Sequence, residues 1–364
     1  MYKLLSTSKM QQTTTDNGIK SYFHKPKLSA KFFAVCFVAI ATASCGNRYG
    51  NSMFPTSESA SDCYRSYLSE VRKTEGCSTE QLIKAINEWR SLRDSVFVCI
   101  GRDTATLPHR GHESVIPALH DSLRIEFSRL ALSTPRTFRD VLLIKEQTSG
   151  YRNDKELMRA VAEIRPFFNS LDSVPTYKGN GKAVIERYRS FLAKTLESGI
   201  NSKDEMLAFI KEEDRLFRSF LARLPDLACA DLSAITRNTE KCCMTIFHSA
   251  ENGSIPYMDA IVYTAGRTAR RIVLNALACR DDIDQGRVRS GDQARAYAWM
   301  LLQPCIAMDG LCMAVMSDAE RETLYGIAGQ TPSLIAGLDR IAGMEDDRWN
   351  TLPELAIRIM IESI

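Results

Sequence analysis

The sequence predicts an all-α protein. Its helices are expected to form a multi-helix bundle or an irregular array, divided into two helical subdomains. Three observations predict this class. Helix-start signals recur along the chain, and apolar residues follow them at a spacing of about 3.6 residues, the period of an α-helix. Sustained two-residue alternation, which marks half-buried strands, does not occur in the sequence.

The helix starts are marked by capping boxes. In such a box a short polar side chain accepts a backbone N–H, and a Glu or Gln further on reaches back to the first residue. The chain carries this pattern at Ser78–Gln81, Asn153–Glu156, Ser202–Glu205, Ser317–Glu320 and Thr351–Glu354. Thr134-Pro135 predicts another start, because proline suits the first helical position.

Residues 1–44 have the pattern of an export signal. Lys25, Lys27 and Lys31 precede an uncharged stretch of 13 residues, Phe32–Ser44. A membrane-spanning helix needs about 20 apolar residues, so this stretch has the length of a signal segment. The polar residues ahead of it are unusually many, and an over-extended N-terminus with initiation at Leu28 is one explanation.

The signal segment closes on Thr42-Ala43-Ser44-Cys45, which resembles a bacterial lipoprotein signal. The resemblance implies that Cys45 receives fatty acyl chains of the palmitate type and becomes the mature N-terminus. Thr42 departs from the pattern, where Leu is the commoner residue. Ala41-Thr42-Ala43 is also an A-x-A site for ordinary secretion, and an uncleaved segment is a third reading.

The expected location is therefore the bacterial cell envelope, at the outer membrane or a periplasmic face. If Cys45 is not lipidated, the expected location is the periplasm or the medium.

The charge of the chain argues against nucleic acid as a partner. Residues 1–44 contain six lysines and one acidic residue, a net charge of +5, which leaves 41 basic and 43 acidic residues in the rest of the chain.

We divide the chain into four parts. Residues 1–44 are the signal segment, and 45–57 are the lipidated cysteine and a short tether. Residues 58–175 and 182–364 are expected to form an N-terminal and a C-terminal helical subdomain. The boundary follows Ser173–Gly181, where Pro175, Gly179 and Gly181 interrupt a helix.

Three clusters are candidates for chemistry. His109, His112 and His120 are potential zinc ligands, but they lack the spacing of the H-E-x-x-H motif. Cys242-Cys243 with His248 suggests a thiol nucleophile, yet nothing nearby orients the pair. The odd cysteine count and the apolar surroundings of most thiols favour buried free cysteines.

The third cluster joins two unusual segments. The apolar stretch Ile261–Ala278 carries Arg267, Arg270 and Arg271, which are suited to a carboxylate or an anion. Ala296–Met316 is apolar almost throughout and predicts a buried helix broken at Pro304, with a membrane span as the alternative. A buried Asp309 needs a cation, so we predict an ion pair with one of the arginines.

The sequence therefore favours a lipid-anchored binding or scaffolding protein over an enzyme. The expected partners are the membrane, through the lipid, and a protein of the envelope. We expect no cofactor, and the sequence names no small-molecule ligand. The alternatives are a periplasmic metal-dependent hydrolase using the histidines, or a binder of a small anion through the arginines.

Overall fold

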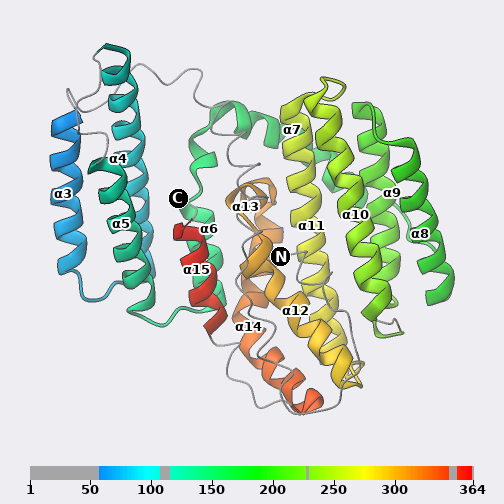
Figure 1. Cartoon of the computed structure of the whole chain (residues 1–364). Helices are drawn as coiled ribbons and strands as arrows, with labels where there is room; N and C mark the ends of the chain where they lie inside the picture. Colours follow the sequence, from blue (N-terminus) through cyan, green and yellow to red (C-terminus); the bar gives the residue numbers. More distant parts are fainter. Residues whose placement is uncertain (1–56, 107–114, 227–228, 344–350, 363–364) are drawn as a thin grey trace, which may run out of the picture. The chain divides into compact units, whose positions relative to one another are not determined.

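The computed structural model describes residues 57–106, 115–226, 229–343 and 351–362, and it confirms the all-α prediction (Figure 1). Within these ranges the chain forms 13 α-helices and two short 3-10 helices, with no strand. The predicted signal segment, Cys45, and the tether up to residue 56 lie outside the described residues.

The chain divides into two compact units. Unit 1 contains the described residues from Ser149 to 343, and unit 2 contains residues 57–148 together with 351–362. This division differs from the predicted boundary near residue 175, because the loop at 173–181 is held inside unit 1. Arg218 Nη2 donates to the carbonyl of Val174 at 2.8 Å, and Ser219 Oγ accepts the N–H of Tyr177 at 2.8 Å.

Unit 2 is a small helical array whose last helix returns from the far end of the sequence. Its helices are α3 (Ser57–Lys73), α4 (Thr79–Thr106), α5 (Val115–Leu132), α6 (Phe138–Gln147) and α15 (Leu352–Glu362). Trp89 of α4 stacks on Phe127 of α5 with ring centroids 4.7 Å apart, and both side chains are fully buried. α15 packs on α5 and α6, where Ile357 and Ile361 are fully buried.

Unit 1 is organised around one long helix, α11 (Tyr257–Asp284). The other helices are α7 (Lys155–Leu171), α8 (Gly181–Ser198), α9 (Lys203–Leu221), α10 (Cys229–Glu251), α12 (Gly291–Ala307), α13 (Gly310–Val315) and α14 (Asp318–Ala342), with 3-10 turns at Gly150–Asn153 and Leu224–Asp226. α11 packs against α7, α9, α10, α12, α13 and α14. A helix contacted from so many sides must bury most of its circumference, so its polar residues need partners from the same chain.

One glycine permits a close contact between α7 and α11. A Cβ atom at Gly266 of α11 would lie 2.4 Å from Cε2 of Phe168 on α7, which is far inside van der Waals contact. The absence of a side chain therefore lets α7 approach α11 closely.

The apolar segment 296–316 is buried as predicted over most of its length, but its break is elsewhere. Pro304 lies inside α12, and the chain leaves the helix at Met308 and Asp309 before α13 begins. A proline at this position removes one backbone hydrogen bond of the helix, and α12 ends three residues after it at Ala307. No helix in the described ranges is long and apolar enough to cross a membrane.

The cap signals were partly correct. Ser317 and Glu320 form a full capping box, and Ser78 and Gln81 exchange the same two hydrogen bonds. At α9 Ser202 caps as predicted, although the Glu205 carboxylate accepts from Asn201 instead. α7 is capped by Asp154, one residue after the predicted Asn153, and α6 by Thr137 rather than near Pro135.

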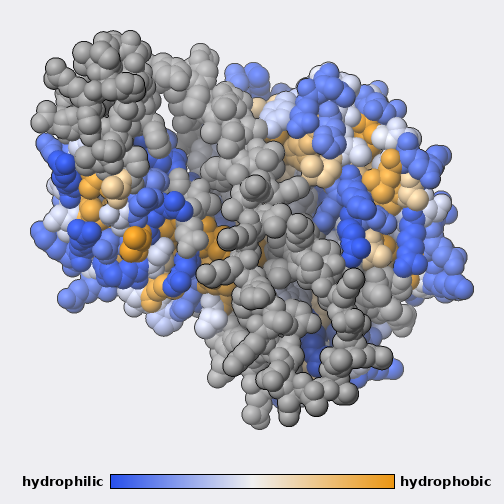
Figure 2. All heavy atoms as spheres, viewed as in Figure 1, coloured by the Kyte–Doolittle hydropathy of each residue, from blue (hydrophilic) through white to orange (hydrophobic). Residues whose placement is uncertain are grey.

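Hydrophilic side chains predominate on the face shown in Figure 2, with small separate apolar areas between them. The large apolar side chains exposed by more than a third, among the described residues, are Ile125, Trp299, Ile341, Leu355 and Ile359. Leu355 and Ile359 lie one turn apart on α15.

Candidate functional site

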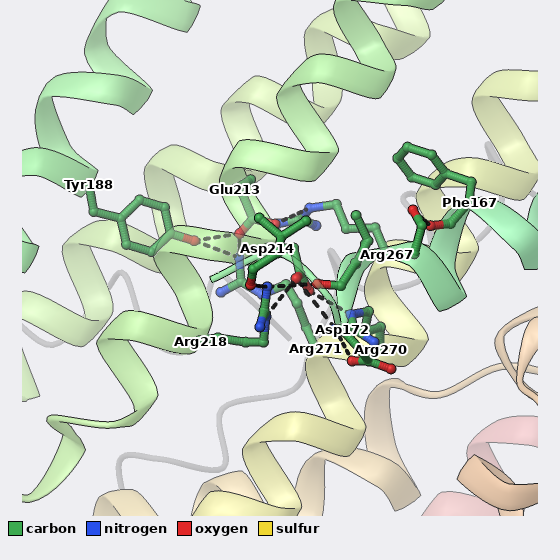
Figure 3. A network of polar contacts seen from close by, with 12 residues as sticks. Phe167, Asp172, Tyr188, Glu213, Asp214, Arg218, Arg267, Arg270 and Arg271 are labelled. Atoms are coloured by element: carbon green, nitrogen blue, oxygen red, sulfur yellow. Dashed lines mark hydrogen bonds and ion pairs between the residues drawn. The ribbon is translucent and has the colours of Figure 1, made fainter. Parts of the chain in front are cut away.

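The arginines singled out in the sequence lie on one face of α11 and point toward α9 (Figure 3). Arg267, Arg270 and Arg271 share that face because residues three or four positions apart are neighbours on a helix. α9 presents two adjacent carboxylates to them, Glu213 and Asp214, both buried. Together with Asp172, Tyr188 and Arg218 these residues form the arginine–carboxylate network.

Glu213 is the fully buried centre of this network. Arg267 Nε donates to its Oε2 at 3.0 Å, and Arg271 and the Tyr188 hydroxyl both donate to its Oε1. Burial acts to raise the pKa of Glu213, but Arg267 and Arg271 outweigh burial and hold the pKa below its ordinary value. The carboxylate is therefore ionised and has donors on both oxygens.

Asp214 holds the second half of the network. Arg270 Nε donates to its Oδ1 at 2.6 Å, and Arg218 Nε donates to its Oδ2 at 2.8 Å. The other end of Arg270 reaches Asp172 at 2.8 Å, just after α7 ends. Arg218 Nη2 also donates to the Leu171 carbonyl at 2.8 Å. Asp214 thus connects α9 to α11 and to the C-terminal end of α7.

Aromatic side chains enclose the Arg271 end of the network. The Arg271 Cζ atom lies 4.0 Å from the centroid of the Phe217 ring, the distance of a cation–π contact. Burial raises the pKa of Tyr188 far above its ordinary value, so the hydroxyl keeps its proton and donates to Glu213. Apart from Asp172, whose side chain is largely exposed, the network is therefore a desolvated set of charges in contact with apolar neighbours.

Asp309 does not take the place that the sequence predicted. It is half-buried and caps α13, where its Oδ1 accepts the N–H of Cys312 at 2.8 Å. The arginines pair with Glu213 and Asp214 and not with Asp309. The break in the helix explains the difference, since a carboxylate at a helix start is satisfied by backbone N–H groups and needs no cation.

Sequence reasoning missed the carboxylates although a signal was present. In α9 the buried residues Met206, Ile210, Phe217 and Phe220 follow helical spacing, and Glu213 occupies the core position between them. A carboxylate at such a position requires a buried cation, by the same argument that was applied to Asp309. Tyr188 and Arg218 carried no comparable signal, because their partners are far away in the sequence.

The histidine cluster is only partly described. His109 and His112 lie outside the described residues, whereas His120 lies in α5 with its ring centroid 5.4 Å from that of Trp89. The described ranges contain no group of three side chains that could hold a metal ion. Nδ1 of His120 is buried without a hydrogen-bond partner in those ranges. His120 is thus a partly buried residue that packs on Trp89 of the unit 2 core.

The thiol cluster is not arranged for nucleophilic chemistry. Cys242 and Cys243 are buried, and burial raises the pKa of Cys242 to about 12, so the reactive thiolate is scarce. His248 is exposed and lies 3.3 Å from Glu251 rather than near a thiol. The Cys242 thiol instead contacts the Leu192 carbonyl on α8 at 3.6 Å. These cysteines serve as small core residues.

The sequence matches no protein-family model, no curated protein and no solved structure. The function must therefore be argued from the residues of this chain. Its most elaborate polar cluster directs arginine side chains at carboxylates of the same unit, and this arrangement stabilises helix packing more directly than it prepares a reaction.

The surroundings of His120 predict a pH dependence for unit 2. Burial lowers the pKa of His120 below 6.5, and the nearby Arg93 and Arg124 lower it further. The unfolded chain therefore takes up a proton first as the pH falls below 6.5, and the native state loses stability down to the folded pKa.

We expect the free energy of unfolding in urea to fall less between pH 7 and pH 5 in His120→Gln than in the unsubstituted protein. His248→Gln, which changes an exposed histidine, is the control and should follow the unsubstituted protein. Parallel pH profiles for all three proteins would show that the protonation of His120 does not oppose folding.

Proposed function

We propose that the protein is a lipid-anchored protein of the bacterial envelope whose helical body acts by binding or scaffolding rather than by catalysis. The proposal that the protein binds or scaffolds rather than catalyses rests on one observation. Arg267, Arg270 and Arg271 pair with Glu213 and Asp214. These side chains were the strongest candidates for binding a substrate anion. Their donors are aimed at carboxylates of the same chain, which favours a structural role.

Two further clusters support the same proposal. The thiols at 242 and 243 are buried with a thiolate disfavoured at neutral pH, and His120 packs on a tryptophan in the core. Residues that a catalyst would expose to a substrate are used here for packing. Helices packed in this way are suited to presenting a surface to another envelope protein.

The anchor is supported by the sequence around Cys45. Lys25, Lys27 and Lys31, the uncharged stretch Phe32–Ser44 and the small residues before Cys45 together resemble a lipoprotein signal. The acyl chains would hold the body near a membrane, because two chains give stable anchoring.

The mass of the mature N-terminal peptide tests the export and anchor directly. The full chain is expressed in a bacterium, purified from detergent-solubilised membranes and from the soluble fraction, and digested with trypsin. We expect an N-terminal peptide that begins at Cys45 and carries the mass of attached acyl chains. An unmodified peptide beginning at Ser44 would show ordinary secretion, and one that extends through residues 32–44 would show that the segment is retained.

Metal content tests the non-catalytic part against a zinc hydrolase. We expect the purified full chain, equilibrated with zinc and then desalted, to retain far less than one zinc ion per chain. Equimolar zinc that is lost in a His109→Ala, His112→Ala double variant would overturn the proposal in favour of a metal site formed by those histidines.

A further inference from the structure

One carboxyl group lies beside the arginine–carboxylate network without joining it. Glu240 is a half-buried residue of α10, and its Oε1 atom is fully buried with no hydrogen-bond partner in the described part of the chain. Buried carboxylate oxygens in native proteins are nearly always hydrogen-bonded. An exception next to a cluster of arginines therefore calls for an explanation.

The titratable and charged neighbours of Glu240 come from its own helix and from the helices around it. Arg271 and Arg267 of α11 face it, and Arg237 and Cys243 lie near it on α10. α8, which also packs on α10, contributes Tyr188, and α9 contributes Glu213, both through the network. α12 carries its charged residues Asp292 and Arg295 in its first turns, where they pair at 2.7 Å.

Glu213 already occupies the arginines that would neutralise an ionised Glu240. Arg267 Nε and Arg271 Nη1 are both directed at the Glu213 carboxylate. A second carboxylate without a partner in this desolvated place is strongly disfavoured, and a carboxyl group in that situation keeps its proton. Burial raises the pKa of Glu240 from 4.5 to about 8, although Arg271 and Arg267 act to lower it.

We propose that Glu240 is a proton-binding site that controls how α10 is held against α11. While the carboxyl O–H bond is intact, Arg267 and Arg271 are held by Glu213, and Glu240 is a neutral neighbour. When the proton leaves to solvent, the new carboxylate competes with Glu213 for the same guanidinium groups. The contact between the two helices then has one arrangement in neutral solution and another in mildly alkaline solution.

Infrared spectroscopy of the full chain tests the protonation itself. We expect the C=O stretch of a protonated carboxyl group at pH 6.5, and its loss on titration with a midpoint near pH 8. Glu240→Gln, which is close in shape to the protonated side chain, should lack this titrating band. Glu251→Gln replaces an exposed carboxylate on the same helix and should retain the band. Absence of the band from the unsubstituted protein, or its presence in Glu240→Gln, would overturn the proposal.

Hydrogen exchange tests the consequence for the helices. Intrinsic exchange is faster at higher pH, so rates are divided by those of an unfolded peptide of the same sequence. We expect the protection of α10 and α11 amides to change between pH 6.5 and pH 9 in the unsubstituted protein and in Glu251→Gln, but not in Glu240→Gln. Equal protection changes in all three proteins would show that Glu240 does not control this contact.

Discussion

Glu213→Gln is expected to lower the free energy of unfolding of the protein by about 3–5 kcal/mol, the usual loss when one partner of a buried ion pair is removed. The substitution keeps the shape of the side chain and removes its charge. Arg267 and Arg271 then remain in the interior beside a neutral amide, whose NH2 group also cannot accept the hydrogen bonds that the carboxylate accepts now. Urea denaturation followed by circular dichroism measures the loss.

Glu212→Gln is the matched control, because it makes the same change at the neighbouring residue of α9. The Glu212 side chain is about one third exposed and lies 3.8 Å from Arg215. An ion pair in that environment contributes only about 0–1 kcal/mol. If Glu213→Gln were no more destabilising than Glu212→Gln, the network would not stabilise unit 1.

Cys45→Ala is expected to move the protein from the membrane fraction to the soluble fraction of the cell. The reason is that Cys45 is the expected point of lipid attachment, and without acyl chains the described part of the molecule has no helix able to span a membrane. Cell fractionation with a carbonate wash, followed by immunoblotting, gives the distribution.

Cys36→Ala is the control for this change. It substitutes the other cysteine of the N-terminal region, inside the uncharged stretch, and should leave the protein in the membrane pellet. If Cys45→Ala were found in the washed pellet as well, the attachment would not depend on a lipid at Cys45.

The all-α class was predictable because its signals are local. A helix start depends on a few consecutive residues, and the periodicity of apolar residues is read within a single element. Ser317 with Glu320 and Ser78 with Gln81 show the success of such signals. The shift from Asn153 to Asp154 shows their limit, because either side chain is a suitable cap and the preceding 3-10 turn decides between them.

The candidate site was predictable only in part, because its partners are distant in the sequence. The sequence predicted that an arginine of the apolar stretch Ile261–Ala278 pairs with a carboxylate inside the fold, and Arg267 and Arg270 are buried and paired in this way. Their counterions, however, come from α9, which precedes α11 by about fifty residues along the chain. Asp309 is the isolated acid of an apolar segment, but the backbone N–H of Cys312 donates to it and no arginine is needed.

The division into units illustrates the same limitation. Pro175 and Gly179 lie in the connection between α7, which ends at Leu171, and α8, which begins at Gly181. Proline and glycine indicate where a helix ends, but they do not indicate whether the helices on either side belong to different units. Arg215 Nε donates to the Pro175 carbonyl at 2.8 Å, so α9 fixes the loop within unit 1.

A double-mutant cycle between Glu213 and Arg267 tests most directly whether these arginines belong to the fold, paired with carboxylates of the same chain. Glu213→Gln, Arg267→Met and the double variant are compared with the unsubstituted protein in urea unfolding. If they do, we expect a coupling free energy of about 1–3 kcal/mol, as for residues in one buried network. A coupling within about 0.5 kcal/mol of zero, the range of independent sites, would contradict it.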